Sequence, residues 1–412
     1  MPALRQWILV CAICIGAPIT AQPSPELAAR LSQPIEVERT GEISALPIAR
    51  HMGKLAIAAS VNSIERQFIF DTGSPTMIAK ELADQLELDI IGSNVGRDAN
   101  GREVRTEFAI VERLDLGGVR FTNVPVMIFD FKAIDPDGCF FDGGVIGSEI
   151  FPGSAWRIDA DNDRLEISAW SDNLTQKEDE ASTISAPLAR FGYPHAPIFG
   201  YRIGTFEDRG LFDTGNSASI VLFNRVAGDA RVQRQMQAGS IVEGRGSEGV
   251  SAGGLGDSVN LLRFELTSFE LGASEPGASE LGPLPGIIRH APPTLMGLGV
   301  MAKYNVTLDY PGSRIILEER AKEEERLPHP GYGLMVANGD LRVMQLYAGT
   351  KAESAGLMLG DHVVAIDGSA PPASDHACAL HKWLIEDRPA ANATSLTVSR
   401  DGQEVLISLA QD

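Results

Sequence analysis

The stretch QFIFDTGSPTMIAKELADQL at residues 67–86 decides the fold, because a related stretch, RGLFDTGNSASIVLFNRVAG, recurs at residues 209–228. In both stretches an apolar run ends in Asp-Thr-Gly, at Asp71 and at Asp213, 142 positions apart. An apolar run that ends at turn residues is typical of a buried β-strand. We therefore expect each Asp to emerge from the end of a buried strand, on a tight turn that the glycine permits.

Further landmarks follow each motif in the same order. Three pairs lie 150 positions apart: Gly147 and Gly297, Asp159 and Asp309, and Arg164 and Arg314. Self-similarity at a nearly constant offset indicates two copies of one structural unit. The chain is rich in glycine (42) and proline (24) and only 6% aromatic, which favours many short strands over long helices. We expect a mainly β fold with two tandem lobes.

Polar and charged segments divide the 412 residues. We predict a first lobe, a linker, a second lobe, a second linker and a C-terminal domain, at residues 35–170, 171–184, 185–320, 321–330 and 331–412. A chain of this length is expected to hold two or three domains. The net charge of −20 excludes nucleic acid as a partner, because phosphate contacts need clustered Lys and Arg.

The N-terminus predicts export. Arg5 precedes a short apolar stretch, and small residues up to Ala21 form an acceptable cleavage site, so residues 1–21 are interpreted as a signal peptide. No later segment reaches the roughly 20 apolar residues of a membrane span, so none is expected in the mature chain. We expect a periplasmic or secreted bacterial protein. Cys139 and Cys378 remain after cleavage, and because they fall in separate predicted domains, the sequence does not imply a disulfide framework.

The two Asp residues carry the predicted chemistry. If the two units pack about a pseudo-twofold axis, Asp71 and Asp213 meet, and two adjacent carboxyl groups share a proton. One carboxylate then acts as general base on water while the protonated partner polarises a peptide carbonyl. We expect the threonines of the motifs to bond across the axis, and Ser74 and Asn216 to donate to the outer carboxylate oxygens. No metal or other cofactor is required, and no HExxH motif occurs.

The paired motifs resemble those of a known family. FDTGS at residues 70–74 and FDTGN at 212–216, each with a downstream apolar-apolar-Gly at 145–147 and 295–297, look like the aspartic peptidases of the pepsin and retroviral type. The short lobes resemble retropepsin-like β-barrel units duplicated in one chain.

The resemblance implies an aspartic endopeptidase that builds one active site within a monomer and acts on peptide or protein substrates. Asp71 and Asp213 would be the catalytic pair, and Gly73 and Gly215 would bound the cleft floor and bind substrate backbone. Such enzymes close a hairpin flap over the substrate. The candidates here are GRDANGREV (96–104), which lacks the flap tyrosine of pepsin-like enzymes, and GSIVEGRGSEGVSAGG (239–254), although both remain open to the interpretation of plain surface loops.

The C-terminal segment (331–412) resembles a PDZ domain of the bacterial protease-associated type. GYGL (331–334) matches its carboxylate-binding loop, and AESAGLMLGDHVVAIDG (352–368) matches its helix-turn-strand signature. The resemblance implies an α+β domain that binds peptide or protein C-termini, with Tyr332, Gly333 and Leu334 lining the site. The alternative is a PDZ-like module used only for domain packing.

Two other functions stay open. The chain could be a catalytically inactive peptide-binding or scaffold protein of aspartic protease descent, in which both Asp residues only cap turns. A glycosidase with two carboxylates is a weaker possibility, because the Thr-Gly context and the low aromatic content do not favour a sugar site.

Overall fold

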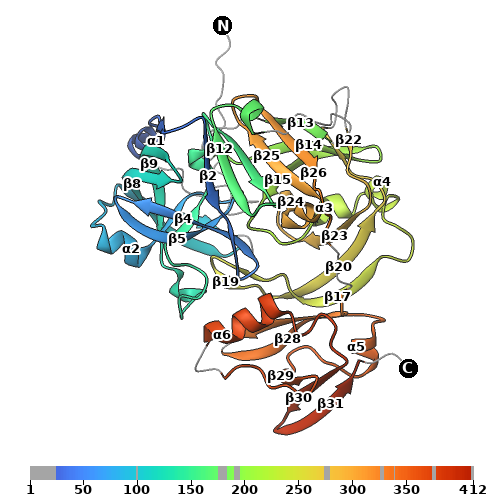
Figure 1. Ribbon diagram of the computed structural model, residues 1–412. Coiled ribbons are helices and arrows are strands. Elements are labelled where there is room, and N and C mark those ends of the chain that lie inside the picture. The colour runs from blue at the N-terminus through green and yellow to red at the C-terminus, as the bar shows by residue number, and fades with distance from the viewer. Residues whose placement is uncertain are drawn as a thin grey trace.

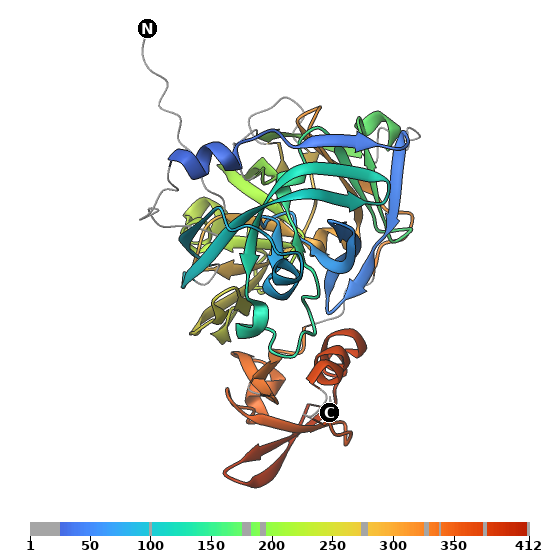
Figure 2. The same cartoon turned by 90° about the vertical axis from the view of Figure 1, so that its left-hand side faces the viewer.

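The computed structural model describes residues 25–98, 101–174, 183–189, 195–272, 279–324, 329–337, 339–373 and 377–409 (Figures 1 and 2). The predicted signal peptide (1–21) lies outside these residues, and so does most of the predicted linker 171–184. Strands dominate the described chain, which confirms the prediction of a mainly β protein. A short helix, α1 (Pro25–Leu31), precedes the strands. None of the helices in the described ranges is long and apolar enough to span a membrane.

The first half of the chain is built around three short strands. Strand β5 (Ile64–Phe70) runs parallel to β10 (Gly144–Ile146), and β10 is antiparallel to β6 (Met77–Ala79). Strand β6 in turn runs parallel to β9. The other elements of this half are β1 (Glu36–Arg39), β3 (Ala49–His51), β4 (Lys54–Val61), α2 (Lys80–Gln85), β7 (Gly92–Arg97), β8 (Glu103–Leu116) and β9 (Val119–Phe129).

The second half repeats this arrangement. Strand β15 (Phe206–Asp213) runs parallel to β24 (Thr294–Gly297), β24 is antiparallel to β16 (Ile220–Phe223), and β16 runs parallel to β23 (Leu284–Arg289). The further elements are β14 (Ile198–Ile203), α3 (Asn224–Ala227), α4 (Ala230–Gln233), β17 (Val242–Ser247), β18 (Val250–Ser251), β19 (Gly254–Leu255), β20 (Ser258–Leu266), β21 (Glu270–Leu271) and β22 (Ser279–Glu280). The internal similarity of the sequence thus corresponds to two halves with the same strand connections.

One antiparallel sheet joins the two halves. Its strands follow the order β2, β12, β11, β25, β26, β13, with bounds Ile43–Pro47, Arg164–Ser168, Ala155–Asp159, Tyr304–Asp309, Arg314–Glu319 and Thr183–Ala189. At its centre Arg157 of β11 pairs with Thr307 of β25. These residues are 150 positions apart, the same offset as the sequence landmarks, so equivalent positions of the two halves face each other across an approximate twofold axis.

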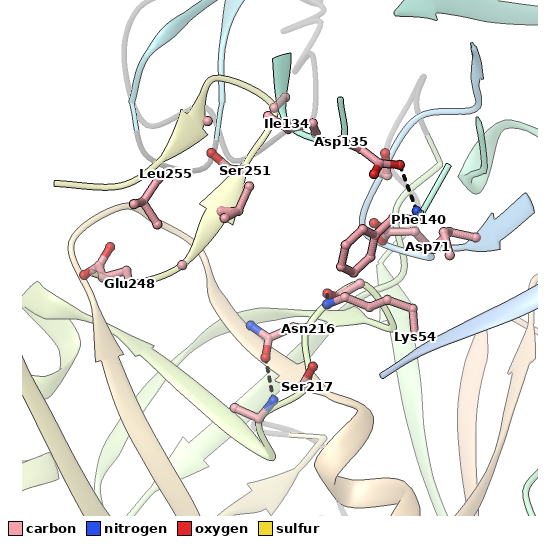
Figure 3. A pocket seen from close by; sticks show the side chains of 18 of the residues that line it. Lys54, Asp71, Ile134, Asp135, Phe140, Asn216, Ser217, Glu248, Ser251 and Leu255 are labelled. Atoms are coloured by element: carbon pink, nitrogen blue, oxygen red, sulfur yellow. Dashed lines mark hydrogen bonds between the residues drawn. The ribbon is translucent and has the colours of Figure 1, made fainter. Parts of the chain in front are cut away.

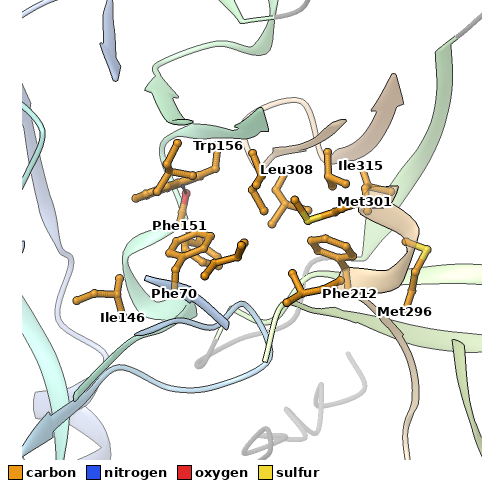
Figure 4. Packing of buried hydrophobic residues seen from close by; sticks show 14 of the residues in the cluster. Phe70, Ile146, Phe151, Trp156, Phe212, Met296, Met301, Leu308 and Ile315 are labelled. Atoms are coloured by element: carbon orange, nitrogen blue, oxygen red, sulfur yellow. Dashed lines mark hydrogen bonds between the residues drawn. The ribbon is translucent and has the colours of Figure 1, made fainter. Parts of the chain in front are cut away.

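A continuous apolar core supports this junction. Phe70, directly before Asp71, packs 5.7 Å from Phe151 and 6.2 Å from Trp156 between ring centroids (Figure 4). Phe212 occupies the equivalent position in the second half, packs in the same cluster and is fully buried. Burying an aromatic side chain of this size contributes about 1.5–3 kcal/mol. The strands that carry the two Asp residues are therefore anchored on one shared core.

The C-terminal module (residues 332–409) has its own small core around Val343, Leu396 and Val398. It comprises β27 (Tyr332–Ala337), β28 (Asp340–Tyr347), α5 (Lys351–Ser354), β29 (His362–Ile366), α6 (Ala377–Lys382), a single π-helical turn (Trp383–Asp387), β30 (Ser395–Arg400) and β31 (Gln403–Ser408). Its strand β28 also pairs with β17 of the second half, at Gly244–Tyr347 and Gly246–Gln345. The module therefore extends a sheet of the second half (Figure 1).

A disulfide also joins the module to the first half. Cys139 and Cys378 are bonded, with their Cα atoms 5.2 Å apart despite a sequence separation of 239. The sequence did not imply this bond, because the two cysteines fall in separate predicted domains. Helix α6 packs on the loop around Cys139, and this contact brings the two thiols together: the ring of His381 stands edge-on to Phe140 at 5.0 Å.

Candidate active site

The two Asp-Thr-Gly loops are fastened to each other by their threonines. The Thr72 hydroxyl donates to the Phe212 carbonyl at 2.7 Å, and the Thr214 hydroxyl donates to the Phe70 carbonyl at 2.7 Å. Each hydroxyl also accepts the backbone N–H of the other threonine, at 3.0 and 3.1 Å. Both threonines are fully buried. The four hydrogen bonds fix the loops face to face, as expected from the motif.

This fastening places each glycine against the carboxyl group of the opposite loop. A Cβ atom added to Gly73 would lie 2.6 Å from Cγ of Asp213, and one added to Gly215 would lie 2.3 Å from Oδ2 of Asp71. Neither glycine has a positive φ. The expected tight turns are present, with the Ser74 N–H donating to the Asp71 carbonyl at 3.3 Å and the Asn216 N–H to the Asp213 carbonyl at 3.1 Å. Glycine is required in them because of close approach rather than because of its φ. The structure thus brings Asp71 and Asp213 together at the centre of the molecule.

The two carboxyl groups have equivalent hydrogen bonds. Oδ1 of Asp71 accepts from the Gly73 N–H at 2.9 Å, and Oδ1 of Asp213 accepts from the Gly215 N–H at 2.9 Å. Close contact with the backbone also explains why the glycine downstream of the first motif, Gly147, is needed. A Cβ at Gly147 would lie 2.2 Å from the Ser74 carbonyl oxygen, which belongs to the first loop.

The electrostatics of the pair favour a bound proton. Burial, the negative charge of Asp213 and the hydrogen bond shared with Asp213 raise the pKa of Asp71 from 3.8 to about 8. Lys54 opposes this rise, and so does the Gly73 N–H. Burial lowers the pKa of Lys54 itself, although both carboxylates act to raise it. The raised pKa of Asp71 therefore favours a proton on the carboxyl pair at neutral pH, with the Lys54 side chain close by.

Ser74 and Asn216 do not make the contacts that we expected of them. The Ser74 hydroxyl donates to the Pro75 carbonyl at 2.9 Å, and Oδ1 of Asn216 accepts the Ala218 N–H at 2.7 Å. These short polar side chains bond neighbouring backbone groups, as is common in turns. The prediction that they bind the outer carboxylate oxygens was wrong for this reason, although both residues line the cavity described next.

A cavity of about 820 Å³ opens above the two carboxyl groups (Figure 3). One wall is the loop that follows β9, where Asp135 accepts the N–H groups of Cys139, Phe140 and Phe141 at 2.7, 2.8 and 3.0 Å. This loop presents Phe140 to the cavity. The opposite wall contains apolar residues of the second half, among them Val221 and Ile287. A cavity of this volume, with apolar walls and a few convergent polar groups, is typical of a ligand-binding site.

The two flap candidates are hairpins whose tips meet. The hairpin β7–β8 carries Asp98, which is fully buried and accepts the Gly253 N–H at 2.7 Å and the Ser251 hydroxyl. Arg102 donates to the Gly253 carbonyl at 3.2 Å and pairs with Asp257 at 2.9 Å. Gly253 and its neighbours form the tip of the second hairpin, between β17 and β20, and this tip lines the cavity. Residues 99–100 of the first candidate lie outside the described ranges.

The C-terminal module reaches the same cavity. Val336, Ala337 and Gly339, at the end of β27, lie among the cavity-lining residues. The side chain of Tyr332, expected to line a peptide site, is instead buried in the core of the module, with its hydroxyl donating to the Ala390 carbonyl at 3.2 Å. Gly333 and Leu334 belong to β27 and pair with β28. The alternation of a strand turns the Tyr332 side chain inward, so a role of Tyr332 in binding a carboxylate would rest on its backbone and stays a prediction.

Sequence reasoning missed two parts of the site. Lys54 belongs to no recognisable motif, and it lines the cavity from the start of β4, a strand that pairs with β5. The loop of Asp135 has a recognisable signal, since Asp-Pro-Asp-Gly followed by Cys-Phe-Phe indicates a turn beside exposed aromatic residues. Within the described ranges, no group of three or more His, Cys, Asp or Glu residues could hold a metal ion.

Comparison with known proteins agrees with this geometry for part of the chain. Residues 57–150, which contain the first Asp-Thr-Gly motif, match the family model described as aspartyl protease. A comparison with curated proteins gives no match. Among solved structures, the crystal structure of Basic 7S globulin from soybean aligns with 67% of this chain and 95% of its own, at 10% identity and a TM-score of 0.40. The match to the family model supports an aspartyl protease.

Proposed function

We propose that the protein is an aspartic endopeptidase that hydrolyses peptide bonds with a water molecule activated by Asp71 and Asp213. The observation that carries the proposal is the reciprocal fastening of the two Asp-Thr-Gly loops, which holds both carboxyl groups in one cavity. The raised pKa of Asp71 favours a proton shared between them. The family match at residues 57–150 supports it. The two halves are then two retropepsin-like lobes, at residues 35–170 and 185–320, that share a single active site.

The chemistry follows from the shared proton. We assign the shared proton to Asp71, whose pKa is raised, and the role of general base to Asp213. Asp213 takes a proton from water while the water oxygen bonds to the peptide carbon, and Asp71 donates its proton to the carbonyl oxygen. The resulting tetrahedral diol collapses when Asp213 returns its proton to the nitrogen, the C–N bond breaks, and one hydroxyl proton goes back to Asp71. One water is consumed, and the pair returns to its starting state.

The two hairpins whose tips meet are proposed to act as flaps. Their tip contacts, between Asp98 and Gly253 and between Arg102 and Asp257, hold the cavity closed over an extended substrate. Gly73 and Gly215 bound the floor beneath the substrate backbone. Excluding water in this way strengthens the electrostatic interactions of the site.

The C-terminal module is proposed to be a PDZ domain (331–412) that binds substrate C-termini. Its strand β27 ends among the cavity-lining residues, so a peptide added to the edge of this strand would lie beside the cavity that holds the carboxyl pair. Backbone groups of Gly333 and Leu334 are the candidates for binding the terminal carboxylate. A peptide with a free C-terminus should show a lower KM than its amidated counterpart, with kcat unchanged; equal KM values would contradict this role.

Export to the periplasm or the exterior is part of the proposal. Structural disulfides persist mainly in oxidising compartments, and the bond between Cys139 and Cys378 supports such a location. It is compatible with the signal peptide predicted at residues 1–21.

The test is cleavage of a peptide library by the full chain and by Asp71→Asn and Asp213→Asn, with Asp89→Asn as the control, since Asp89 is exposed and does not line the cavity. Both dyad variants should lose at least about a thousandfold in kcat/KM, because each removes either the base or the shared proton. Wild-type rates in either variant would refute the assignment. Absence of turnover in the unmodified chain, together with measurable peptide affinity, would instead establish an inactive peptide-binding protein.

A further inference from the structure

Lys54 is a cationic side chain inside the candidate active site that neither the motif nor the proposed mechanism uses. It is the first residue of β4, directly after the turn that joins β3 to β4. It lines the same cavity as Asp71, as Figure 3 shows, and Asp213 lines this cavity too. Lysine is rarely buried unless its ammonium group is paired, so this placement calls for a functional explanation.

The ammonium group is held on the second Asp-Thr-Gly loop. Nζ of Lys54 donates to the carbonyl oxygen of Gly215 at 2.5 Å. Gly215 is also the residue whose N–H, in the preceding peptide group, binds Oδ1 of Asp213, and its Cα lies against the carboxyl group of Asp71. One side chain of the first half thus fixes the backbone segment of the second half that contacts both carboxyl groups.

The position of Lys54 is also fixed from outside the site. The turn before it contacts the C-terminal module, where the Met52 N–H donates to Oε1 of Glu386 at 3.3 Å, and a Cβ at Gly53 would lie 3.1 Å from Ile385. The side chain of Lys54 therefore enters the cavity from a turn that is packed on the module.

We propose that Lys54 is a positioning residue of the dyad: its ammonium group fixes the backbone at Gly215, through the carbonyl of that residue, against Asp71 and supplies a positive charge to both carboxyl groups. This inference rests on the proposed function. The other charged or titratable groups that line the cavity are Asp135, Asp137, Glu248, Arg289, Tyr347 and His381. The carboxylate of Asp135 is engaged by three backbone N–H groups, and Glu248 pairs with His290. The interactions of Asp71 that favour its ionised form come from Lys54 and the Gly73 N–H.

A positive charge near the dyad has a defined kinetic consequence. It favours the ionised forms, so both proton losses of the pair occur at lower pH than they would without it. The active, singly protonated dyad is bounded by these two losses, which form the two limbs of a bell-shaped pH profile of kcat/KM. Removing the charge should move both limbs to higher pH in parallel. A lysine with a purely structural role would change the rate but leave the limbs where they are.

The test compares Lys54→Met, which keeps the length and removes the charge, with Lys54→Arg, which keeps the charge. Lys80→Met is the matched control, because Lys80 is an exposed lysine paired with Asp84 on α2. We expect Lys54→Met to move both limbs upward by about one pH unit, and Lys54→Arg and Lys80→Met to keep them in place. Unmoved limbs in Lys54→Met, or limbs that move downward, would overturn the proposal.

A second readout does not depend on catalysis. In protein labelled with ¹³C at aspartate carboxyls, the Asp71 signal is assigned by its loss in Asp71→Asn, and its titration is followed by NMR. Lys54→Met should raise the pH at which this carboxyl titrates, whereas an unchanged titration would overturn the inference. If Asp71→Asn keeps wild-type cleavage, the proposed function fails, and the NMR titration still decides the role of Lys54.

Discussion

Replacing Thr72 by valine should loosen the joint between the two Asp-Thr-Gly loops. The side chain keeps its shape but loses a hydroxyl that donates to the Phe212 carbonyl and accepts the Thr214 N–H. Both partners are then left unpaired in a fully buried place. Each buried unpaired group costs about 1–3 kcal/mol, so the loss of stability should be about 2–6 kcal/mol. Thr72→Ser keeps both hydrogen bonds and should cost about 1 kcal/mol, for the lost methyl group.

The chain offers a matched control at Thr307. This residue is equally buried and also lies at the approximate twofold axis, but its hydroxyl has no hydrogen-bond partner among the described residues. Thr307→Val therefore removes an unsatisfied polar group and should be neutral or stabilising by up to about 1 kcal/mol.

The assay is urea unfolding followed by intrinsic fluorescence, to which Trp156 contributes from the core beneath the joint. We expect a lower midpoint for Thr72→Val, a small change for Thr72→Ser and none or a rise for Thr307→Val. The kcat of Thr72→Val on a peptide substrate should also fall, because the carboxyl groups of Asp71 and Asp213 are no longer fixed relative to each other. If Thr72→Val is no less stable than Thr307→Val, the fastening does not hold the halves together, and the reasoning is refuted.

Three further predictions concern the flaps, the disulfide and the pH dependence of stability. Asp98→Asn should raise KM several-fold, because the tip contacts with Ser251 and Gly253 are weakened; an unchanged KM would show that the tip contacts do not matter for binding. Cys378→Ser should lower the melting temperature, because a disulfide that closes a long loop stabilises the folded protein by about 2–4 kcal/mol. The melting temperature of this variant should no longer respond to a reductant, and a variant that still responds would contradict the bond. Asp71→Asn should stabilise the protein increasingly as the pH rises from about 4 to 8, because folded Asp71 keeps its proton up to about pH 8 while the unfolded chain loses it near 3.8. A difference in melting temperature that stays constant over this range would contradict the raised pKa.

Most of the features that could be predicted follow from short sequence patterns and from their repetition along the chain. The apolar run before each Asp indicates a buried strand, and the structure has β5 and β15 there, with Asp71 and Asp213 at their ends. The constant offset of 150 corresponds to the pairing of Arg157 with Thr307 in the shared sheet. These features depend on residues that are neighbours in sequence or equivalent by repetition.

What could not be predicted depends on contacts between distant residues or on a choice between close hydrogen-bond partners. Lys54 and the bond between Cys139 and Cys378 arise from tertiary packing, for which the sequence carries no local sign. Ser74 had a correct location but a wrong partner, because a backbone carbonyl one residue away competes successfully with a carboxylate.

The central claim is that Asp71 and Asp213 form one proton-sharing pair, and titration of the Asp71 carboxyl with and without Asp213 measures this directly. By ¹³C NMR of labelled aspartate, Asp71 should titrate near pH 8 in the unmodified protein and at clearly lower pH in Asp213→Asn, where the neighbouring negative charge is gone. A titration near pH 4 in both proteins would mean that the two carboxyl groups do not interact, and the hydrolytic mechanism would have no basis.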